Sequence, residues 1–127
     1  MANREVKYGN AYAKYLASDG VTVATQTLAT TSKVPSGAII TSTTVIARGA
    51  VASGGSATIA IIAGGVTSTS AIAKAKLDTA NFVVREDVVE DAAAVSDGTA
   101  IKVAVGTDAL TGGTADLDII VEYILVD

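Results

Sequence analysis

The chain contains no cysteine and no histidine among its 127 residues. Without cysteine it can form neither disulfides nor thiolate metal sites, and its redox compartment cannot be inferred. Without histidine it lacks the usual general base, the commonest metal ligand and the base partner of a serine nucleophile. Carboxylates and lysines could still support an enzyme, but the two absences together favour a protein without catalysis and without a cofactor.

Large side chains and proline are also scarce. Aromatic residues make up 4% of the chain although half of it is hydrophobic, and Pro35 is the single proline. Ala, Val, Ile and Thr supply most of the apolar surface, and side chains branched at Cβ suit a pleated sheet. Because small side chains bury little area per residue, a domain of this size is expected to gain stability from contact with other subunits.

Long apolar segments are absent as well. The longest, residues 57–66, is interrupted by Gly64 and Gly65 and is shorter than the ~20 residues of a membrane-spanning helix. Residues 1–15 lack the apolar core of a signal peptide. We therefore expect a protein that is made in the cytoplasm, is soluble once folded and has no membrane partner.

The charge is divided unevenly along the chain. Residues 1–76 carry seven basic and two acidic side chains, a net charge of +5, whereas residues 77–127 carry two basic and eleven acidic ones, a net charge of −9; the total is −4. This total argues against a nucleic-acid partner. Two interpretations stay open: the halves neutralise each other within one sheet system, or a basic patch of one copy faces an acidic patch of its neighbour.

Several segments alternate apolar and other side chains with period two, as strands with two different faces do. The clearest are residues 100–105 and 116–126, and the second face of the latter turns apolar at Ile124 and Val126. We expect that end to be covered by another element or another subunit. Strands are also predicted at 21–28, 38–50 and 56–63, a loop at 30–37, strand or irregular structure at 67–77, a short apolar segment at 81–85, one or two helical turns at 87–95, and turns at 18–20, 53–55 and 97–98.

A short internal repeat links two of these strands. GGSATIAII at 54–62 resembles GGTADLDII at 112–120, and in each copy a Gly-Gly pair precedes a strand. Each pair therefore predicts a tight turn that joins two antiparallel strands, because glycine takes positive φ at no steric cost. Several short strands separated by turns predict an all-β fold, namely an antiparallel β-sandwich of jelly-roll type with an extended N-terminal arm.

Residues 1–17 are predicted to form this arm and residues 18–127 the sandwich domain. Three of the four tyrosines lie in the arm among small and basic residues, and an aromatic ring with a polar tip suits a contact surface. The alternative is that these tyrosines cover the end of the core. The candidate interface residues are Arg4, Lys7, Tyr8, Tyr12, Lys14, Tyr15, Ile124 and Val126.

Two groups of carboxylates are candidates for chemistry. Residues 86–91 contain Glu86, Asp87, Glu90 and Asp91, and oxygen-rich clusters can hold Ca²⁺, but the spacing matches no calcium loop. Asp116, Asp118 and Glu122 share one strand face. We interpret the first group as a solvated acidic turn and the second as a face turned to water or to a basic partner. Neither the Gly-Gly pairs nor any other segment has the pattern of a phosphate-binding loop.

Three stretches resemble small structural proteins of tailed bacteriophages, among them capsid decoration or cement proteins. They are the opening YGNAYAKYLA, the stretch VPSGAIITSTTVIARGAV followed by SATIAI, and the ending DGTAIKVAVGTDALTGGTADLDIIVEY. The resemblance extends from Tyr8 to the C-terminus. The chain departs from the pattern in having one aromatic residue, Phe82, between Tyr15 and Tyr123.

The resemblance implies a β-sandwich protein on the exterior of a phage capsid. There it would bind the major capsid protein, bridge neighbouring capsid subunits and form a homo-oligomer, with a trimer favoured because hexamer junctions offer three-fold positions. Two alternatives remain: a tail, neck or head-fibre component of the virion, and a virion module that binds host glycans. The resemblance implies no cofactor.

Overall fold

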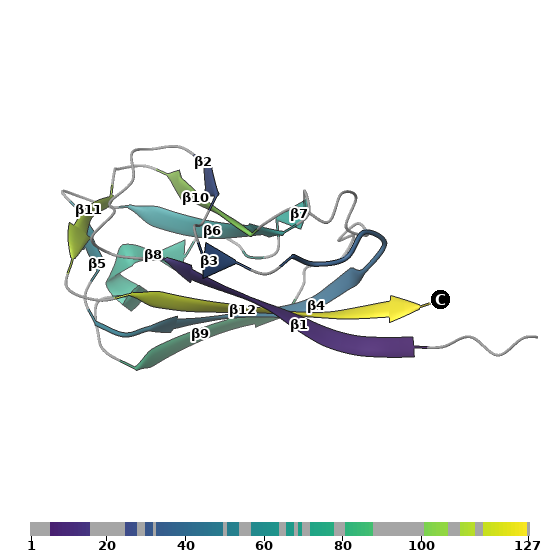
Figure 1. The fold of residues 1–127 in the computed structure, drawn as a ribbon. Coiled ribbons are helices and arrows are strands. Elements are labelled where there is room, and N and C mark those ends of the chain that lie inside the picture. The colour runs from purple at the N-terminus through teal and green to yellow at the C-terminus, as the bar shows by residue number, and fades with distance from the viewer. Residues whose placement is uncertain are drawn as a thin grey trace, which may run out of the picture.

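The computed structural model describes residues 6–15, 25–27, 30–31, 33–49, 51–53, 57–63, 66–67, 69, 72–77, 81–87, 101–106, 110–113 and 116–126. Over these residues the chain consists of β-strands, connecting turns and one short 3₁₀ helix, Lys74–Leu77. Two main sheets lie one above the other (Figure 1). No helix within the described part of the chain is long and apolar enough to span a membrane.

Twelve strands form three sheets in the described part of the chain. The first sheet has the order β3-β1-β12-β4-β9, the second has the order β2-β10-β6-β7 with β8 also paired to β6, and a small third sheet pairs β11 with β5. The strands are β1 Val6–Tyr15, β2 Thr25–Thr27, β3 Thr30–Thr31, β4 Ile39–Ala47, β5 Val51–Ser53, β6 Thr58–Ala63, β7 Val66–Thr67, β8 Ile72–Ala73, β9 Phe82–Asp87, β10 Lys102–Gly106, β11 Leu110–Gly113 and β12 Leu117–Val126.

The strand pairs are nested along the chain. The outermost pair is β1 with β12, the next is β2 with β10, the third is β4 with β9, and the innermost is β6 with β7, all antiparallel. Such nesting, with the pairs distributed over two facing sheets, is the arrangement of a jelly roll. The predicted antiparallel β-sandwich of jelly-roll type is therefore confirmed.

The internal repeat marks two crossings between the sheets and not two hairpins. In the first copy the Gly-Gly pair follows β5 in the chain and precedes β6, on the way from β4 of the first sheet to β6 of the second. In the other copy the pair ends β11, on the way from β10 of the second sheet to β12 of the first. Gly112 and Gly113 are part of β11 and pair with β5, so they do not form the predicted turn. The turn predicted at 53–55 falls mostly outside the described residues.

The core lies between the two sheets and is built from alternate residues of the longer strands. In β12 the inward side chains are Leu117, Ile119 and Val121, and in β10 they are Val103 and Val105. All are small or medium-sized aliphatic groups, as the composition predicts. The core also takes one large ring, Tyr15 of β1, which is 1% exposed. Burial of these side chains supplies most of the favourable free energy of folding.

The segment predicted as an arm is a strand inside the sandwich. All ten residues of β1 pair with β12, from Val6 opposite Val126 to Tyr15 opposite Leu117. The first sheet therefore includes part of the predicted arm, and a domain beginning at residue 18 would omit one of its interior strands. The physical reason is burial, because Ala11, Ala13 and Tyr15 alternate toward the core. Arg4 lies outside the described residues.

Most of the other predicted elements agree with the structure where it describes them, but residues 30–31 of the predicted loop form β3, and Asp87, where helical turns were predicted to begin, ends β9. Residues 38–50 contain β4, 56–63 contain β6, 81–85 lie within or beside β9, and 67–77 contain β8 and the 3₁₀ helix. The loop at 30–37 begins with β3 and ends in a turn closed by the Ala38 N–H, which donates to the Pro35 carbonyl at 3.1 Å. Gly37 has a φ of 87° there, which suits glycine at the third position of a type II turn. The helical turns predicted at 87–95 begin at a strand residue and otherwise lie outside the described residues.

Replacing Gly9 by alanine is expected to destabilise the sheet by about 1–3 kcal/mol, because a well-packed site must then accept extra volume. Gly9 lies opposite Tyr123, and a Cβ at this position would lie 2.7 Å from the ring carbon Cζ. Urea denaturation measures the cost. In a Tyr123→Ala background the same change should cost much less, since the ring is gone. If Gly9→Ala cost the same in the natural chain and in the Tyr123→Ala variant, the loss of stability would come from the backbone at residue 9 and not from the contact with the ring.

Candidate interaction surface

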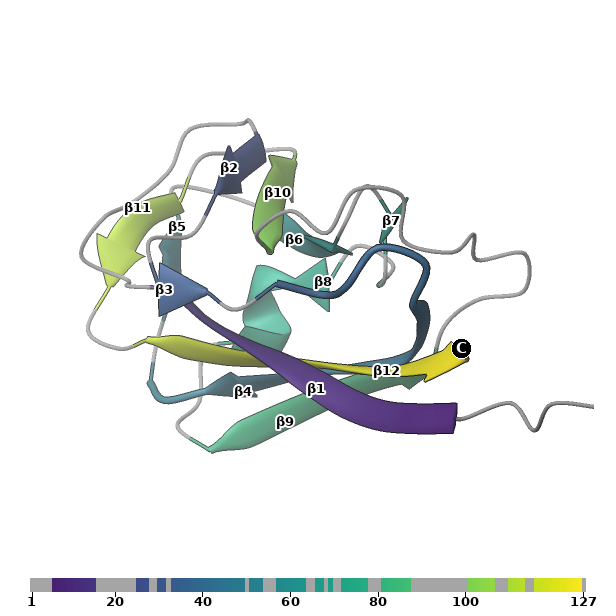
Figure 2. The same ribbon diagram turned by 45° about the vertical axis from the view of Figure 1, so that its right-hand side comes forward.

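The outer face of the first sheet is the candidate interaction surface. β1, β12, β4 and β9 lie side by side along one side of the molecule, and the second sheet lies on their other side (Figures 1 and 2). Among the described elements, none packs against this outer face in either view. The face therefore consists of the side chains that alternate with the core residues.

One end of this face is apolar. Tyr8 of β1 lies opposite Ile124 of β12, which lies opposite Ile39 of β4, so the three form one row across the sheet. Tyr8 is 82% exposed, Ile39 is 44% exposed and Ile124 is half-buried. Val6, 45% exposed, precedes this row on the same face of β1. We refer to Val6, Tyr8, Ile39 and Ile124 as the apolar patch. Large apolar side chains gathered at an exposed sheet end are typical of contact surfaces.

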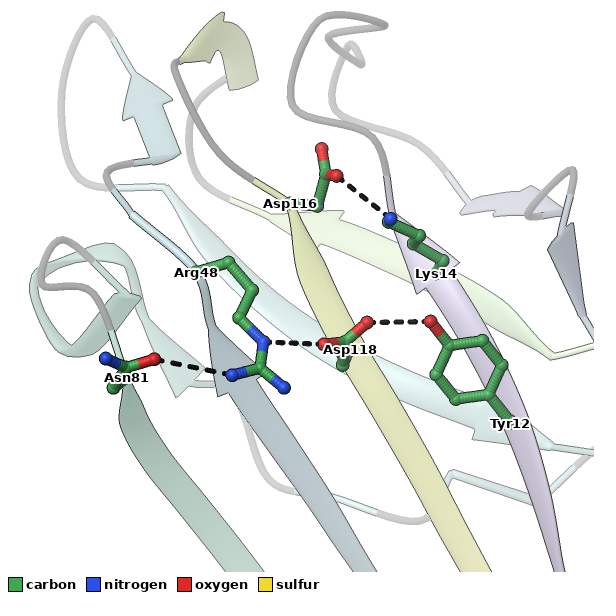
Figure 3. Close-up of polar contacts among 6 residues, drawn as sticks. All are labelled: Tyr12, Lys14, Arg48, Asn81, Asp116 and Asp118. Carbon is green, nitrogen blue, oxygen red and sulfur yellow. Dashed lines mark hydrogen bonds and ion pairs between the residues drawn. The ribbon is translucent and has the colours of Figure 1, made fainter.

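The opposite end of the face is occupied by a polar network centred on Asp118 (Figure 3). The Tyr12 hydroxyl donates to Oδ1 of Asp118 at 2.7 Å, and Nε of Arg48 donates to Oδ2 at 2.7 Å. Nη1 of Arg48 also donates to Oδ1 of Asn81 at 3.3 Å. The network thereby connects β1, β12, the end of β4 and the turn before β9. We refer to Tyr12, Arg48, Asn81 and Asp118 as the Asp118 network.

The surroundings of Asp118 shift its pKa and that of its partner Tyr12. Partial burial alone would raise the pKa of Asp118, but hydrogen bonds from Arg48 and Tyr12, together with the positive charge of Arg48, lower it. The hydrogen bond to Asp118 is the main cause that raises the pKa of Tyr12. The pKa of Lys14 is raised mainly by its hydrogen bond to Asp116. The arrangement therefore favours an ionised Asp118 and a protonated Tyr12 and Lys14.

Replacing Asp118 by asparagine is expected to cost about 1–2 kcal/mol at neutral pH, the scale of a charge-assisted hydrogen bond at a partly buried site. Because the folded state lowers the pKa of Asp118, the stabilisation is present above the ordinary aspartate pKa of about 4 and is lost as the pH falls through the lowered value. The difference in unfolding free energy between the natural chain and the variant should therefore shrink in acid. Urea titrations at neutral and acidic pH measure this difference.

The neighbouring Asp116→Asn change is the matched control for this prediction. Asp116 makes an ion pair with Lys14 at 3.2 Å, and both side chains are over one-third exposed. Exposed pairs of this kind contribute little, so its effect should be smaller than that of Asp118→Asn. If the cost of Asp118→Asn were the same at both pH values, the carboxylate charge would not be what stabilises the network.

The two halves of the chain neutralise each other at this end of the sheet. Lys14 and Arg48 belong to the basic half, and their partners Asp116 and Asp118 belong to the acidic half. The structure thus shows the first of the two interpretations of the uneven charge, since β1 and β4 both lie beside β12.

The structure distributes the predicted interface residues over three environments. Lys7 and Tyr8 are exposed on β1, and Ile124 is half-buried in the apolar patch. Tyr12 and Lys14 lie on the same outer face, but Tyr12 is bound by Asp118 of β12 and Lys14 by Asp116, the residue before β12. Tyr15 is buried in the core and cannot reach a partner. Arg4 lies outside the described residues, and only the backbone pairing of Val126 with Val6 is described.

Sequence reasoning missed Ile39 of the apolar patch and Arg48 of the Asp118 network. Ile39 begins β4 and is one of two consecutive isoleucines, of which Ile40 is buried. The sequence alone does not say which of the pair faces out. Arg48 follows the same strand, and only the pairing of β4 with β12 places it beside Asp118. The predicted strand at 38–50 includes both Ile39 and Arg48. A pattern within one strand cannot show that Ile39 lies beside Ile124 or Arg48 beside Asp118.

The carboxylate groups form no cluster suited to a cation within the described ranges. Glu86 and Asp87 lie at the end of β9, where Asp87 is 3.9 Å from Arg85, and Glu90 and Asp91 lie outside the described residues. Asp116 and Asp118 bind basic side chains, and Glu122 is exposed farther along β12. Asp116 and Asp118 thus form ion pairs that connect β12 and the residue before it with β1 and the end of β4.

Comparison with known proteins finds a solved structure with a similar fold but no matching protein family. No protein-family model matches the chain, and no curated protein sequence matches it significantly. Among solved structures, the fold is similar to that of a chain of the cyanophage Pam1 capsid asymmetric unit, with a TM-score of 0.59 and 20% sequence identity. The similarity covers 96% of this chain and 86% of that chain, so it extends over both sheets of the jelly roll.

Proposed function

We propose that this protein is a structural, non-enzymatic component of a tailed-phage virion that decorates the outside of the capsid. It binds the major capsid protein through the apolar patch, bridges neighbouring capsid subunits and acts as a trimer. The observation that carries the proposal is the jelly-roll fold shared, over nearly the whole chain, with a chain of the cyanophage Pam1 capsid asymmetric unit.

The chemistry of the surface supports a role in assembly. Tyr8 is 82% exposed and forms one row with Ile124 and the exposed Ile39. An aromatic ring surrounded by aliphatic groups suits the centre of a protein interface, where tyrosine is enriched. At the other end of the outer face Asp118 is already paired with Arg48, so contact there would not bury this charge without a partner.

The proposed mechanism is stabilisation by mass action. A protein that binds the assembled shell and not its separated subunits shifts the equilibrium toward the shell, by an amount that grows with the free concentration of the protein. Each copy would contribute interface area that exists only when neighbouring capsid subunits lie side by side. Added protein should therefore raise the temperature at which the capsid opens.

The first test is to locate the protein on intact particles by electron microscopy. Three-fold or two-fold positions on the outside of the head are expected. A ring of five-, six- or twelve-fold symmetry at the neck or tail would assign the protein to the alternative tail, neck or head-fibre role. Binding to host glycans by the isolated protein, without any position on the shell, would favour the glycan-binding module.

The second test is binding of variants to capsids that lack the protein. Tyr8→Ala should lower the affinity about tenfold or more, the scale of one interface hot spot, and its exposure means that folding should be unaffected. Lys76→Ala is the matched control, because Lys76 is exposed on the 3₁₀ helix outside the apolar patch. Equal occupancy for both variants would show that the patch does not bind the shell.

A further inference from the structure

The first sheet has two strand edges that no described strand covers. β1 pairs with β12 on one side, and on the other side its pairing with β3 involves Ala13 and Lys14, so that no described strand pairs with the outer edge of residues 6–10. In Figure 2 β3 lies beside the other end of β1. β9 pairs with β4 on one side and with no described strand on the other. Each edge presents a row of N–H and C=O groups that can accept a further strand.

The two edge strands, β1 and β9, run in opposite directions, as antiparallel pairing between two copies requires. Each of the pairs β1 with β12, β12 with β4, and β4 with β9 is antiparallel. β9 therefore runs opposite to β1. A second copy placed beside β9 in the same orientation as the first brings its own β1 antiparallel to β9, and the alternation of directions continues from one copy to the next.

The charges and faces of the two edges also match. Lys7 is the second residue of β1, and Glu86 and Asp87 are the last two residues of β9. Antiparallel pairing of the two strands therefore places the basic first residues of β1 beside the acidic last residues of β9. In the register that places Lys7 opposite Glu86, Asn10 lies opposite Val83. This register keeps like faces together, because Lys7 shares the face of buried Ala11 and Glu86 shares the face of half-buried Val84. The two edges also come from oppositely charged parts of the chain, because β1 lies in the basic residues 1–76 and β9 in the acidic residues 77–127. This difference in charge favours the same pairing of β1 with β9.

We propose that copies of this protein join edge to edge, with residues 6–10 of β1 in one copy paired antiparallel to residues 83–87 of β9 in the next, Lys7 opposite Glu86. The contact is heterologous, since each copy contributes a different edge on each side, and such contacts close into rings when the rotation allows it. The inference deepens the proposed function by specifying the contact within the proposed trimer, and it rests on that function only for the number of copies in the ring.

Disulfide cross-linking tests the register, and the absence of natural cysteine gives a clean background. Within one copy, Asn10 and Val83 lie on strands that are separated by β12 and β4, which is about 14 Å at the usual strand spacing. Any disulfide between them must therefore connect two copies. The double variant Asn10→Cys/Val83→Cys is expected to form covalent multimers under oxidation, and these should revert to single chains with reductant.

Two controls separate this arrangement from others. Each single-cysteine variant should stay monomeric on a non-reducing gel, because a heterologous contact does not bring a residue against its own copy. The pair Asn10→Cys/Arg85→Cys, shifted by two residues, should cross-link much less. Strong cross-linking of Asn10→Cys alone would show β1 against β1 and overturn the proposal. So would a natural chain that remains monomeric by light scattering at the concentration used for cross-linking.

A charge exchange tests the same contact without cysteine. Lys7→Glu and Glu86→Lys should each weaken self-association about threefold to tenfold, and the double variant should restore it, because the opposite charges again face each other. Additive weakening in the double variant would contradict the register. These experiments use the purified protein alone, so loss of edge pairing and loss of capsid binding through the apolar patch are distinguishable.

Discussion

Replacing Tyr15 by alanine is expected to lower the free energy of unfolding by about 3–5 kcal/mol, the range for removing a large buried aromatic side chain. Tyr15 is the largest side chain of the core and is 1% exposed. The surrounding core is made of Ala, Val, Ile and Leu, whose short side chains cannot reach across the space that the ring leaves. Urea denaturation followed by circular dichroism measures the loss.

Tyr8→Ala is the matched control on the same strand. Tyr8 and Tyr15 have the same side chain, but Tyr8 points away from the core and is 82% exposed, so its removal should change the unfolding free energy by about 0.5 kcal/mol or less. Equal effects of the two changes would mean that β1 does not pack as the structure shows. A large effect of Tyr15→Ala alone would establish that the N-terminal tyrosines have two separate roles.

Deleting residues 2–15 is expected to prevent the domain from folding. The deletion removes β1, which pairs with β12 over ten residues and supplies Ala11, Ala13 and Tyr15 to the core. Loss of Tyr15 alone consumes a large part of the ~5–15 kcal/mol that stabilises a typical domain. The remaining chain would also expose one long edge of β12. We expect an insoluble or unfolded product without a cooperative thermal transition.

A shorter deletion of residues 2–5 distinguishes a strand from an arm. It leaves β1 complete, so the domain should keep its cooperative transition near that of the natural chain. Had residues 1–17 formed a separate arm, both truncated chains would fold and only capsid binding would suffer. A folded product from the longer deletion would therefore contradict the placement of β1 within the sheet.

These expectations change how a role for the N-terminus must be tested. Because β1 contributes both to the core and to the outer face, truncating the chain removes stability together with any contact surface. Point changes at exposed positions such as Tyr8 or Lys7 leave the core intact and test the contact alone. The apolar patch and the edge of β1 are different surfaces of the same strand, so a single strand can take part in capsid binding and in contact between copies.

The sequence was sufficient to predict the β class of the protein and the inward face of β12. It did not predict the inward faces of β1 and β4, since Tyr15 was assigned to an interface and Ile39 was not distinguished from Ile40. In residues 117–125 every second side chain is apolar and those between them include Asp118 and Glu122, so the pattern predicts which side chains face inward. The structure buries Leu117, Ile119 and Val121 as expected. This succeeds because alternation is a local property: successive side chains of a strand point to opposite faces whatever the strand pairs with.

Which strands are neighbours could be learned only from the folded chain. Tyr12 and Asp118 are 106 residues apart in the chain, and Arg48 and Asp118 are 70 apart. No local pattern encodes such pairs, so the N-terminal strand was expected to be an arm and the Gly112-Gly113 pair a turn. The pairing of β1 with β12 arises because the sandwich buries both strands against one core, and that gain depends on the whole sheet at once.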